Sequence, residues 1–141
     1  MGLSYIFTLM QSLTLTKEQY QKMIAHVESH LPLEACGLLA GHDSKVETVL
    51  KVANQAQSDV RFVMDPIEQL NAFEWIDSNN MELVGIFHSH PTGPESVSPT
   101  DIAEAAYAVV YVIFARVGGA WRARGFWIED NEFREVLLQI I

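Results

Sequence analysis

An apolar run that ends in two histidines constrains this chain more than any other feature. Residues 82–87 are largely apolar and predict a buried strand, and His88 and His90 follow it directly. Side chains two residues apart on a strand point to the same side, so this strand presents two imidazoles together. We expect the rest of the chain to hold this pair in place.

A loop rich in proline, glycine and serine separates the histidines from a predicted helix start. In Ser98-Pro99-Thr100-Asp101, serine stands at the N-cap, proline at the first helical position and an acid at the third. Such a sequence is common at helix starts, so capping alone can explain it. Both roles are compatible, because the first turn of a helix is a rigid place for a metal ligand. Asp101 is therefore a candidate third ligand beside the two histidines.

Two histidines and one carboxylate form the ligand set of a catalytic zinc site, in which the fourth position is left for water. A structural zinc site would need four ligands, usually several cysteines, and the chain has only Cys36. Zinc lowers the pKa of bound water from about 15.7 to about 7. A hydrolytic site then needs a general base, for which Glu34 is the candidate, and an oxyanion donor, for which Ser98 is the candidate.

Each of these residues also has an ordinary structural interpretation. A single H-x-H on a strand is weak evidence for a metal. Glu34 by itself could be an exposed loop acid, which is the usual place for a glutamate. It is the combination of these residues that favours a hydrolytic metal centre.

The remaining patterns predict one α/β domain over residues 1–141, with a mixed, mostly antiparallel β-sheet core flanked by about three helices. Helices are expected at 17–30, where Thr16 and Gln19 form a capping box, at 66–80 after the cap Asp65, and from 99 to about 107. The second of these helices carries an apolar stripe of Ile67, Leu70, Phe73 and Ile76. Strands are expected at 36–40, 46–52, 60–64, 82–87, 109–114, 121–128 and 133–138.

Two further features, a histidine pair on the first helix and the single cysteine, could suggest other catalytic sites, but the surrounding residues do not favour either. His26 and His30 share a helix face, but Glu28 points to the other side, unlike the glutamate that directly follows the first histidine of a zincin helix. We expect a solvated helix face there. Cys36 lies in an apolar strand, which favours an inert buried thiol over the nucleophile of a cysteine hydrolase. A zinc deaminase is excluded, because it needs a P-C-x-x-C motif.

The chain is acidic, with a formal net charge of −9 and a sequence pI of about 4.8. An acidic surface does not attract phosphate backbones or lipid headgroups, so we expect neither nucleic acid nor an anionic membrane as a partner. No apolar run approaches the ~18 residues of a membrane helix, and the first ten residues lack the features of a signal peptide. We expect a cytoplasmic protein, with residues 1–12 as an extra strand or a loose extension.

Taken together, these residues resemble the JAMM (MPN+) family of zinc metalloproteases, in its compact prokaryotic form. The family signature is an upstream glutamate followed by H-x-H-P-x6-S-x2-D. It is matched here at every spacing by Glu34, His88-Ser89-His90-Pro91, Ser98 and Asp101. The stretches 34–41 and 62–66 are also similar to the family, and the resemblance extends from about Leu13 to the C-terminus.

This resemblance implies a cytidine-deaminase-like JAMM/MPN fold and one Zn²⁺ per chain, bound by His88, His90 and Asp101. Glu34 would take a proton from water and pass it to the leaving amine, while Ser98 would stabilise the tetrahedral intermediate. The implied partner is a ubiquitin-like or sulfur-carrier protein, cleaved at a peptide or isopeptide bond after its C-terminal Gly-Gly. The short chain has no room for the long insertions of the deubiquitinases, which favours small carriers. The alternative is a non-catalytic MPN-type protein-binding scaffold, although such relatives usually lack a ligand.

Overall fold

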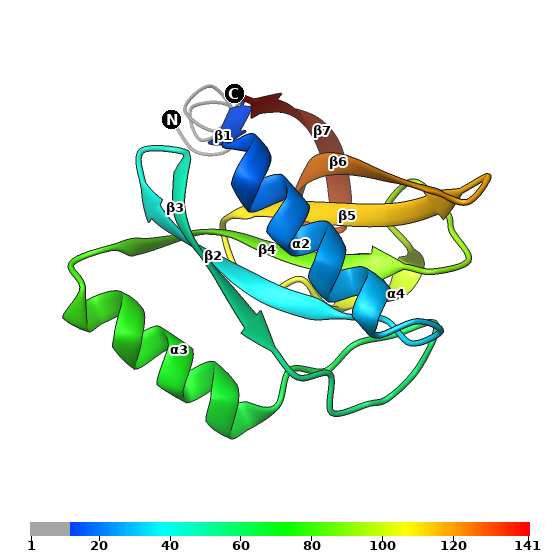
Figure 1. Cartoon of the computed structure of the whole chain (residues 1–141), viewed down its shortest axis with the longest axis horizontal. Coiled ribbons are helices and arrows are strands. Elements are labelled where there is room, and N and C mark those ends of the chain that lie inside the picture. Colours follow the sequence, from blue (N-terminus) through cyan, green and yellow to red (C-terminus); the bar gives the residue numbers. More distant parts are fainter. Residues whose placement is uncertain (1–11) are drawn as a thin grey trace.

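Seven strands of the computed structural model, which describes residues 12–141, close into a barrel in the order β1-β3-β2-β4-β5-β6-β7 (Figure 1). The strands are β1 (Ser12–Leu15), β2 (Cys36–His42), β3 (Lys45–Val52), β4 (Glu82–His90), β5 (Val110–Val117), β6 (Ala120–Glu129) and β7 (Glu132–Ile140). Three helices accompany them: α2 (Lys17–Ser29), α3 (Pro66–Ser78) and α4 (Pro99–Glu104). The predicted fold class, a mixed sheet with about three helices, is confirmed.

Strand β4, which carries the two histidines, lies between two other strands of the barrel. It pairs antiparallel with β2 and parallel with β5, while β2–β3, β5–β6 and β6–β7 are antiparallel. Strand β1 pairs in parallel with β3 and β7 and so closes the barrel. Because β4 has a neighbour on both sides, its final residues, His88 and His90, are held in register by two strands.

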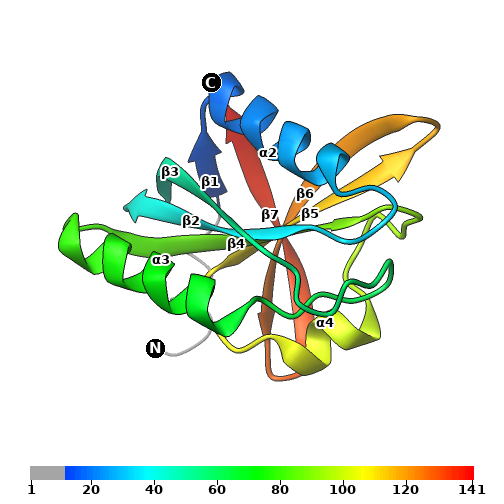
Figure 2. The ribbon, with the colours of Figure 1, turned by 60° about the horizontal axis from the view of Figure 1, so that its bottom comes forward.

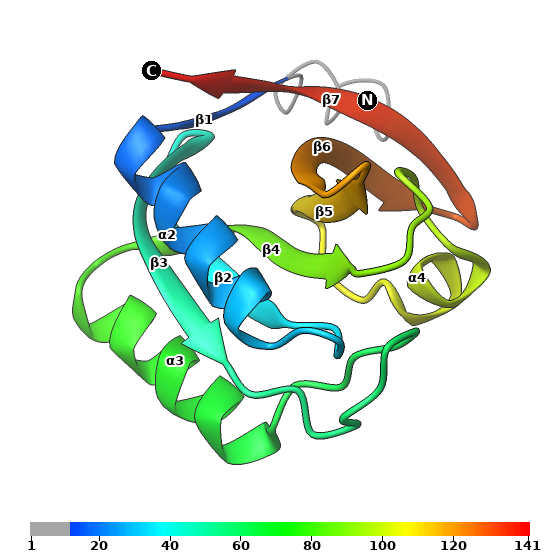
Figure 3. The ribbon, with the colours of Figure 1, turned by 45° about the vertical axis from the view of Figure 1, so that its right-hand side comes forward.

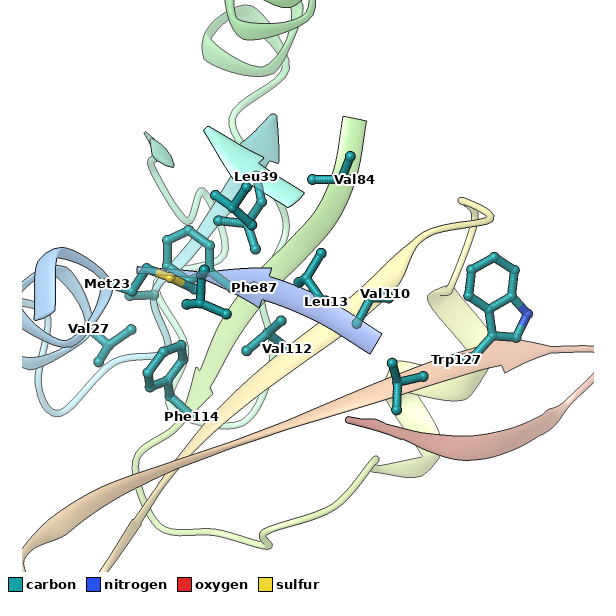
Figure 4. Close-up of a cluster of buried hydrophobic side chains, with 14 residues drawn as sticks. Leu13, Met23, Val27, Leu39, Val84, Phe87, Val110, Val112, Phe114 and Trp127 are labelled. Carbon is teal, nitrogen blue, oxygen red and sulfur yellow. The ribbon is translucent and has the colours of Figure 1, made fainter. Parts of the chain in front are cut away.

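Successive side chains of the sheet separate into two apolar clusters, one on each face. The first cluster packs the α2 residues Met23 and Val27 against strand residues that include Phe87 and Phe114 (Figure 4). The second cluster contains strand residues such as Ile86 and packs against α3 and α4. Because Phe87 belongs to the first cluster, the neighbouring His88 points to the opposite face, toward α3 and α4.

Helices α2 and α3 begin where their capping residues predict. The Thr16 hydroxyl accepts from the amide of Gln19 at 3.1 Å, and the Gln19 side chain accepts from the Thr16 amide at 2.8 Å. Asp65 caps α3 through the amide of Glu68 at 2.9 Å. The apolar stripe of α3 packs on the sheet only in its C-terminal half. Ile76 is buried, whereas Ile67 is 70% and Leu70 57% exposed.

Two predicted elements are wrong, in both cases because a side chain takes the backbone hydrogen bonds that the element would need. Residues 60–64 form no strand, since the Asn54 side chain binds the Val63 amide and the Arg61 carbonyl. Helix α4 ends at Glu104 rather than near residue 107, since the Tyr111 hydroxyl accepts from the next amides, those of Ala106 and Tyr107.

The prediction of a solvated face on α2 is wrong for His26. That residue is only 6% exposed, because its ring packs edge-on against Phe87 of β4 and its Nε2 is 2.9 Å from the Cys36 carbonyl oxygen. Within residues 12–141, the side chains that could hold a metal ion are His88, His90 and Asp101, and neither His26 nor His30 belongs to this group.

The described residues begin at Ser12, so they do not cover most of the N-terminal segment for which a strand or extension was expected. The predicted strand or extension at residues 1–12 lies outside the described residues except for Ser12, with which β1 begins. Strand β1 itself was not predicted. Within residues 12–141, no helix combines the length and apolar character needed to cross a membrane.

We expect Gly37→Ala to destabilise the barrel by about 1–3 kcal/mol. A Cβ at this position in β2 would clash with the Phe87 ring and lie 2.6 Å from the Leu50 carbonyl oxygen, and the carbonyl belongs to a paired strand. Urea unfolding measures the change. The control is Lys51→Ala, an exposed residue directly opposite Gly37, which should stay within about 0.5 kcal/mol of wild type. Equal stability of the two variants would contradict the close packing at Gly37.

Candidate metal centre

The pairing of β2 with β4 brings the upstream glutamate to the two histidines. Cys36 lies opposite His88, and the Ser89 amide donates to the Ala35 carbonyl at 3.0 Å. Continuing this register by one residue places Glu34 opposite His90. Directly opposed residues of an antiparallel pair point to the same face. Glu34 and His90 are more than fifty residues apart in the sequence, but the pairing of β2 with β4 brings them together (Figure 3).

Helix α4 supplies the carboxylate that completes the group. Asp101 Oδ1 lies 3.0 Å from His88 Nε2, and Asp101 Oδ2 lies 3.1 Å from His90 Nε2. The same Oδ2 accepts from the Ser98 amide at 2.9 Å, as the capping box requires. The cap therefore aims the carboxylate at the histidines, so capping and ligand positioning coexist in one residue.

The three side chains have the geometry that a metal ion needs. The two histidine Nε2 atoms are 3.2 Å apart, and each lies 3.0–3.1 Å from an oxygen of Asp101, Oδ1 for His88 and Oδ2 for His90. Ligands about 2.0–2.1 Å from one tetrahedral ion are separated by about 3.3 Å. His90 Nδ1 donates to the Pro94 carbonyl oxygen at 2.8 Å, which turns Nε2 toward His88 and Asp101. His88, His90 and Asp101 can therefore hold a metal ion.

Burial and mutual contact set the charges of this group. Burial lowers the pKa of His88, which keeps its imidazole neutral. Burial alone would also lower the pKa of His90, but its hydrogen bonds to Asp101 and Pro94 raise it. Burial alone would raise the pKa of Asp101, and the hydrogen bonds from both histidines instead hold it far below its usual range. Asp101 is thus ionised at neutral pH, as a metal ligand should be.

Glu34 is buried beside these ligands rather than exposed in a loop. Its side chain is 3% exposed, and Oε1 has no hydrogen-bond partner among residues 12–141. Burial, assisted by the negative charges of Asp101 and Asp59, raises the pKa of Glu34 to about 7, although His90 opposes the shift. A carboxyl with this pKa can both accept and release a proton at neutral pH.

Ser98 is the N-cap of α4, and its hydroxyl accepts from the Asp101 amide at 3.1 Å. A serine hydroxyl has one proton and two lone pairs. Accepting this bond leaves the proton of Ser98 available to a ligand. The Cys36 thiol, in contrast, donates to the Val52 carbonyl at 3.4 Å, and burial raises its pKa to about 12. A thiol in that state is not a nucleophile at neutral pH, as expected for Cys36.

Asn54 is a positioning residue that the sequence did not reveal. Its Nδ2 donates to the carbonyls of Glu34 and Arg61, and its Oδ1 accepts from the amides of Ala56 and Val63, all at 2.9–3.1 Å. This one side chain thus ties the loop after β3 to the backbone of Glu34. An asparagine after a strand is an ordinary loop residue, so no sequence pattern sets it apart.

Two other supporting residues were also missed as such. Ser89, between the histidines, points to the opposite face, where its hydroxyl accepts from the Ala35 amide at 2.9 Å. Phe62 stacks on the His88 ring with centroids 4.5 Å apart and an interplanar angle of 27°. Both contacts join segments far apart in sequence, and they limit the movement of Glu34 and His88.

A mixed α/β fold with a two-histidine, one-aspartate group at the end of a central strand defines a class of metal-site proteins. The chain belongs to the prokaryotic homologs of the JAB domain, whose family model matches residues 16–127. The resemblance to compact prokaryotic members of the JAMM family is thereby confirmed.

Similar proteins share most of the chain. It is 34% identical to a desampylase of Pyrococcus furiosus over 125 residues, which are 87% of each chain. It is 36% identical to a probable TtuB-protein conjugate cleaving protease of Thermus thermophilus, over 83% of this chain and 75% of that one. A solution structure of a protein from Desulfitobacterium hafniense matches it with a TM-score of 0.82 and 35% identity over 92% of both chains.

We expect Asn54→Ala to lower the free energy of unfolding by about 1–3 kcal/mol, because it leaves buried backbone groups without partners. Chemical denaturation of the two proteins measures the difference. Asn71→Ala, at an exposed position of α3, is the matched control and should change stability by less than about 0.5 kcal/mol. If the two alanine variants were equally stable, Asn54 would have no such positioning role.

Proposed function

We propose that this protein is a zinc-dependent metallopeptidase. It hydrolyses the peptide or isopeptide bond after the C-terminal glycine of a ubiquitin-like or sulfur-carrier protein. The observation that carries the proposal is Glu34, a buried carboxyl with an unpartnered oxygen beside three metal-ligand side chains. The names of two relatives, a desampylase and a conjugate-cleaving protease, support cleavage of protein conjugates. We place the reaction in the cytoplasm, where a free thiol such as Cys36 stays reduced.

Zinc is the metal that this ligand set suits best. His88 and His90 offer imidazole nitrogens and Asp101 a carboxylate oxygen, and catalytic zinc sites commonly have three such ligands and one open position. When bound, zinc would supply a Lewis acid and lower the pKa of a water at that position. The buried surroundings strengthen every charge interaction of the site, because little water screens them.

The chain's own residues perform the proton transfers. Glu34 accepts a proton from the attacking water at its unpartnered Oε1 and later delivers it to the leaving amine. Its pKa of about 7 suits both steps. The Ser98 hydroxyl, still accepting from the Asp101 amide, donates a hydrogen bond to the oxyanion that forms at the scissile carbonyl and keeps its proton. His90, held through Nδ1 by Pro94, keeps the ligand geometry constant during the reaction.

The alternative class, a non-catalytic scaffold, is disfavoured by the completeness of the site. A scaffold has no need of a buried ionised Asp101 between two histidines, or of an unpaired buried Glu34, and both are costly to bury. Retained partner binding without cleavage of any Gly-Gly-tailed carrier would favour this alternative.

Replacing a metal ligand should abolish metal binding, whereas replacing the general base should strongly lower activity and leave metal binding intact. We expect about one zinc ion per purified chain, lost in His88→Ala but kept in Glu34→Gln, because Glu34 is not a ligand. Glu34→Gln should lower kcat by about 10²–10⁴-fold, the usual contribution of a general base. Elemental analysis and a cleavage assay with a Gly-Gly-tailed carrier give both readouts. Glu28→Gln, on the exposed side of α2, is the control. Full activity of Glu34→Gln would refute the proposal.

Replacing Ser98 by glycine should distinguish its two roles. Glycine is an acceptable N-cap, so Ser98→Gly should cost only a few tenths of a kcal/mol in stability. Loss of the hydroxyl should still lower kcat by about 10²–10³-fold if it binds the oxyanion. Thermal unfolding and kinetics of the zinc-loaded protein measure the two effects. Unchanged kcat in a stable variant would reduce Ser98 to a helix cap.

A further inference from the structure

An apolar pocket of about 220 Å³ lies beside the metal centre, between β4, α4 and the loop that precedes α3. Figure 2 shows α4 next to the N-terminal end of α3 and this loop. The pocket walls include Phe62, Ile86, Ala105 and Tyr111. Two of the metal-ligand side chains, His88 and Asp101, also line it. The pocket therefore adjoins the position where a scissile bond would be held.

Several contacts hold the walls of the pocket in place before any ligand arrives. The Phe62 ring is stacked on His88, and the Tyr111 hydroxyl accepts from two backbone amides at 3.1 Å each. An ion pair between Arg61 and Glu104, at 3.1 Å, joins the loop to α4 across the pocket's rim. A preformed pocket selects its occupant by shape, because little binding energy is spent on ordering it.

The size and lining of the pocket specify an apolar occupant. An apolar cavity of ~150 Å³ is large enough for benzene, so 220 Å³ accepts a leucine, methionine or phenylalanine side chain. Glu104 and Asp101 are the charged residues of its lining, and both are acidic. An aspartate or glutamate side chain would be repelled there and would also lose its hydration.

In the proposed reaction, the residue after the scissile bond is the part of the substrate whose side chain can reach this pocket. The two residues before the scissile bond are glycines and have no side chain. The residue before them lies three positions away, about 10 Å along an extended chain. The first residue after the bond is the nearest one with a side chain.

We propose that this pocket binds the side chain of the residue that follows the carrier's Gly-Gly, and that it selects a large apolar residue there. This inference rests on the proposed function and adds a specificity for the leaving group. The released product would be an amino acid or peptide that begins with such a residue. Phe62, Ala105 and Tyr111 would determine the preference, while Glu34 and the metal ligands perform the hydrolysis.

The test uses the zinc-loaded chain and a ubiquitin-like sulfur-carrier protein that ends in Gly-Gly-X, with X as leucine, phenylalanine, asparagine, aspartate or glycine. We expect kcat/KM to be at least about tenfold higher for leucine and phenylalanine than for the other three. Ala105→Leu, which fills the pocket, should remove this advantage, so that kcat/KM for leucine and phenylalanine falls to the level of the other three substrates. Ala103→Leu, at an exposed position of α4 two residues earlier, should behave as wild type.

Binding of toluene gives a second readout that does not depend on hydrolysis. In NMR titrations, toluene should shift the Ile86 methyl signals of the wild-type chain and of Ala103→Leu but not of Ala105→Leu. A kcat/KM that is the same for every X, or that Ala105→Leu lowers equally for all, would overturn the pocket proposal alone. If no Gly-Gly-X carrier is cleaved, the proposed function and this inference fail together.

Discussion

The contact of one buried carboxylate with two buried imidazoles governs this structure. Asp101 is ionised away from bulk water, and such a charge is costly to bury without partners. His88, His90 and the Ser98 amide satisfy its oxygens. This requirement explains why the loop after β4 folds back and why α4, a helix of only six residues, starts where it does. The capping box and the ligand group share Asp101, because the hydrogen bond from the Ser98 amide to its carboxylate both caps α4 and directs that carboxylate toward the histidines.

The surroundings of Glu34 show how the barrel prepares a proton carrier. Continuing the register of β2 and β4 places this residue opposite His90. Asn54 and Ser89 both bind the peptide group that follows Glu34, Asn54 at its carbonyl and Ser89 at its amide. Burial then raises its pKa to about 7. The same apolar surroundings make the neighbouring Cys36 inert, because burial stabilises the neutral forms of both carboxyl and thiol. The same burial therefore lets Glu34 exchange a proton near neutral pH and keeps Cys36 a protonated, unreactive thiol.

Much of the fold was predictable where local signals agree. The capping residues of α2 and α3 and the apolar run of β4 predict the residue at which each element begins, because these signals act within one turn or one strand. The failures share a physical cause. Residues 60–64 and the end of α4 depend on backbone amides that donate to the side chains of Asn54 and Tyr111. The burial of His26 depends on how α2 packs on the sheet. Each of these is a long-range or side-chain contact that periodicity does not encode.

The sequence by itself determined the chemistry of the candidate site: two histidines on one side of a strand, an aspartate in a capped first turn, and a signature that includes Glu34. These follow from strand alternation and capping, which are local rules. Only the tertiary structure decided that Glu34 meets His90 and is buried with an unpartnered oxygen, and that Asn54 supports it. It also decided that Phe62 and Tyr111 enclose a pocket beside the ligands. Strand pairing and packing join residues fifty positions apart, and their outcome depends on the whole core rather than on any one segment.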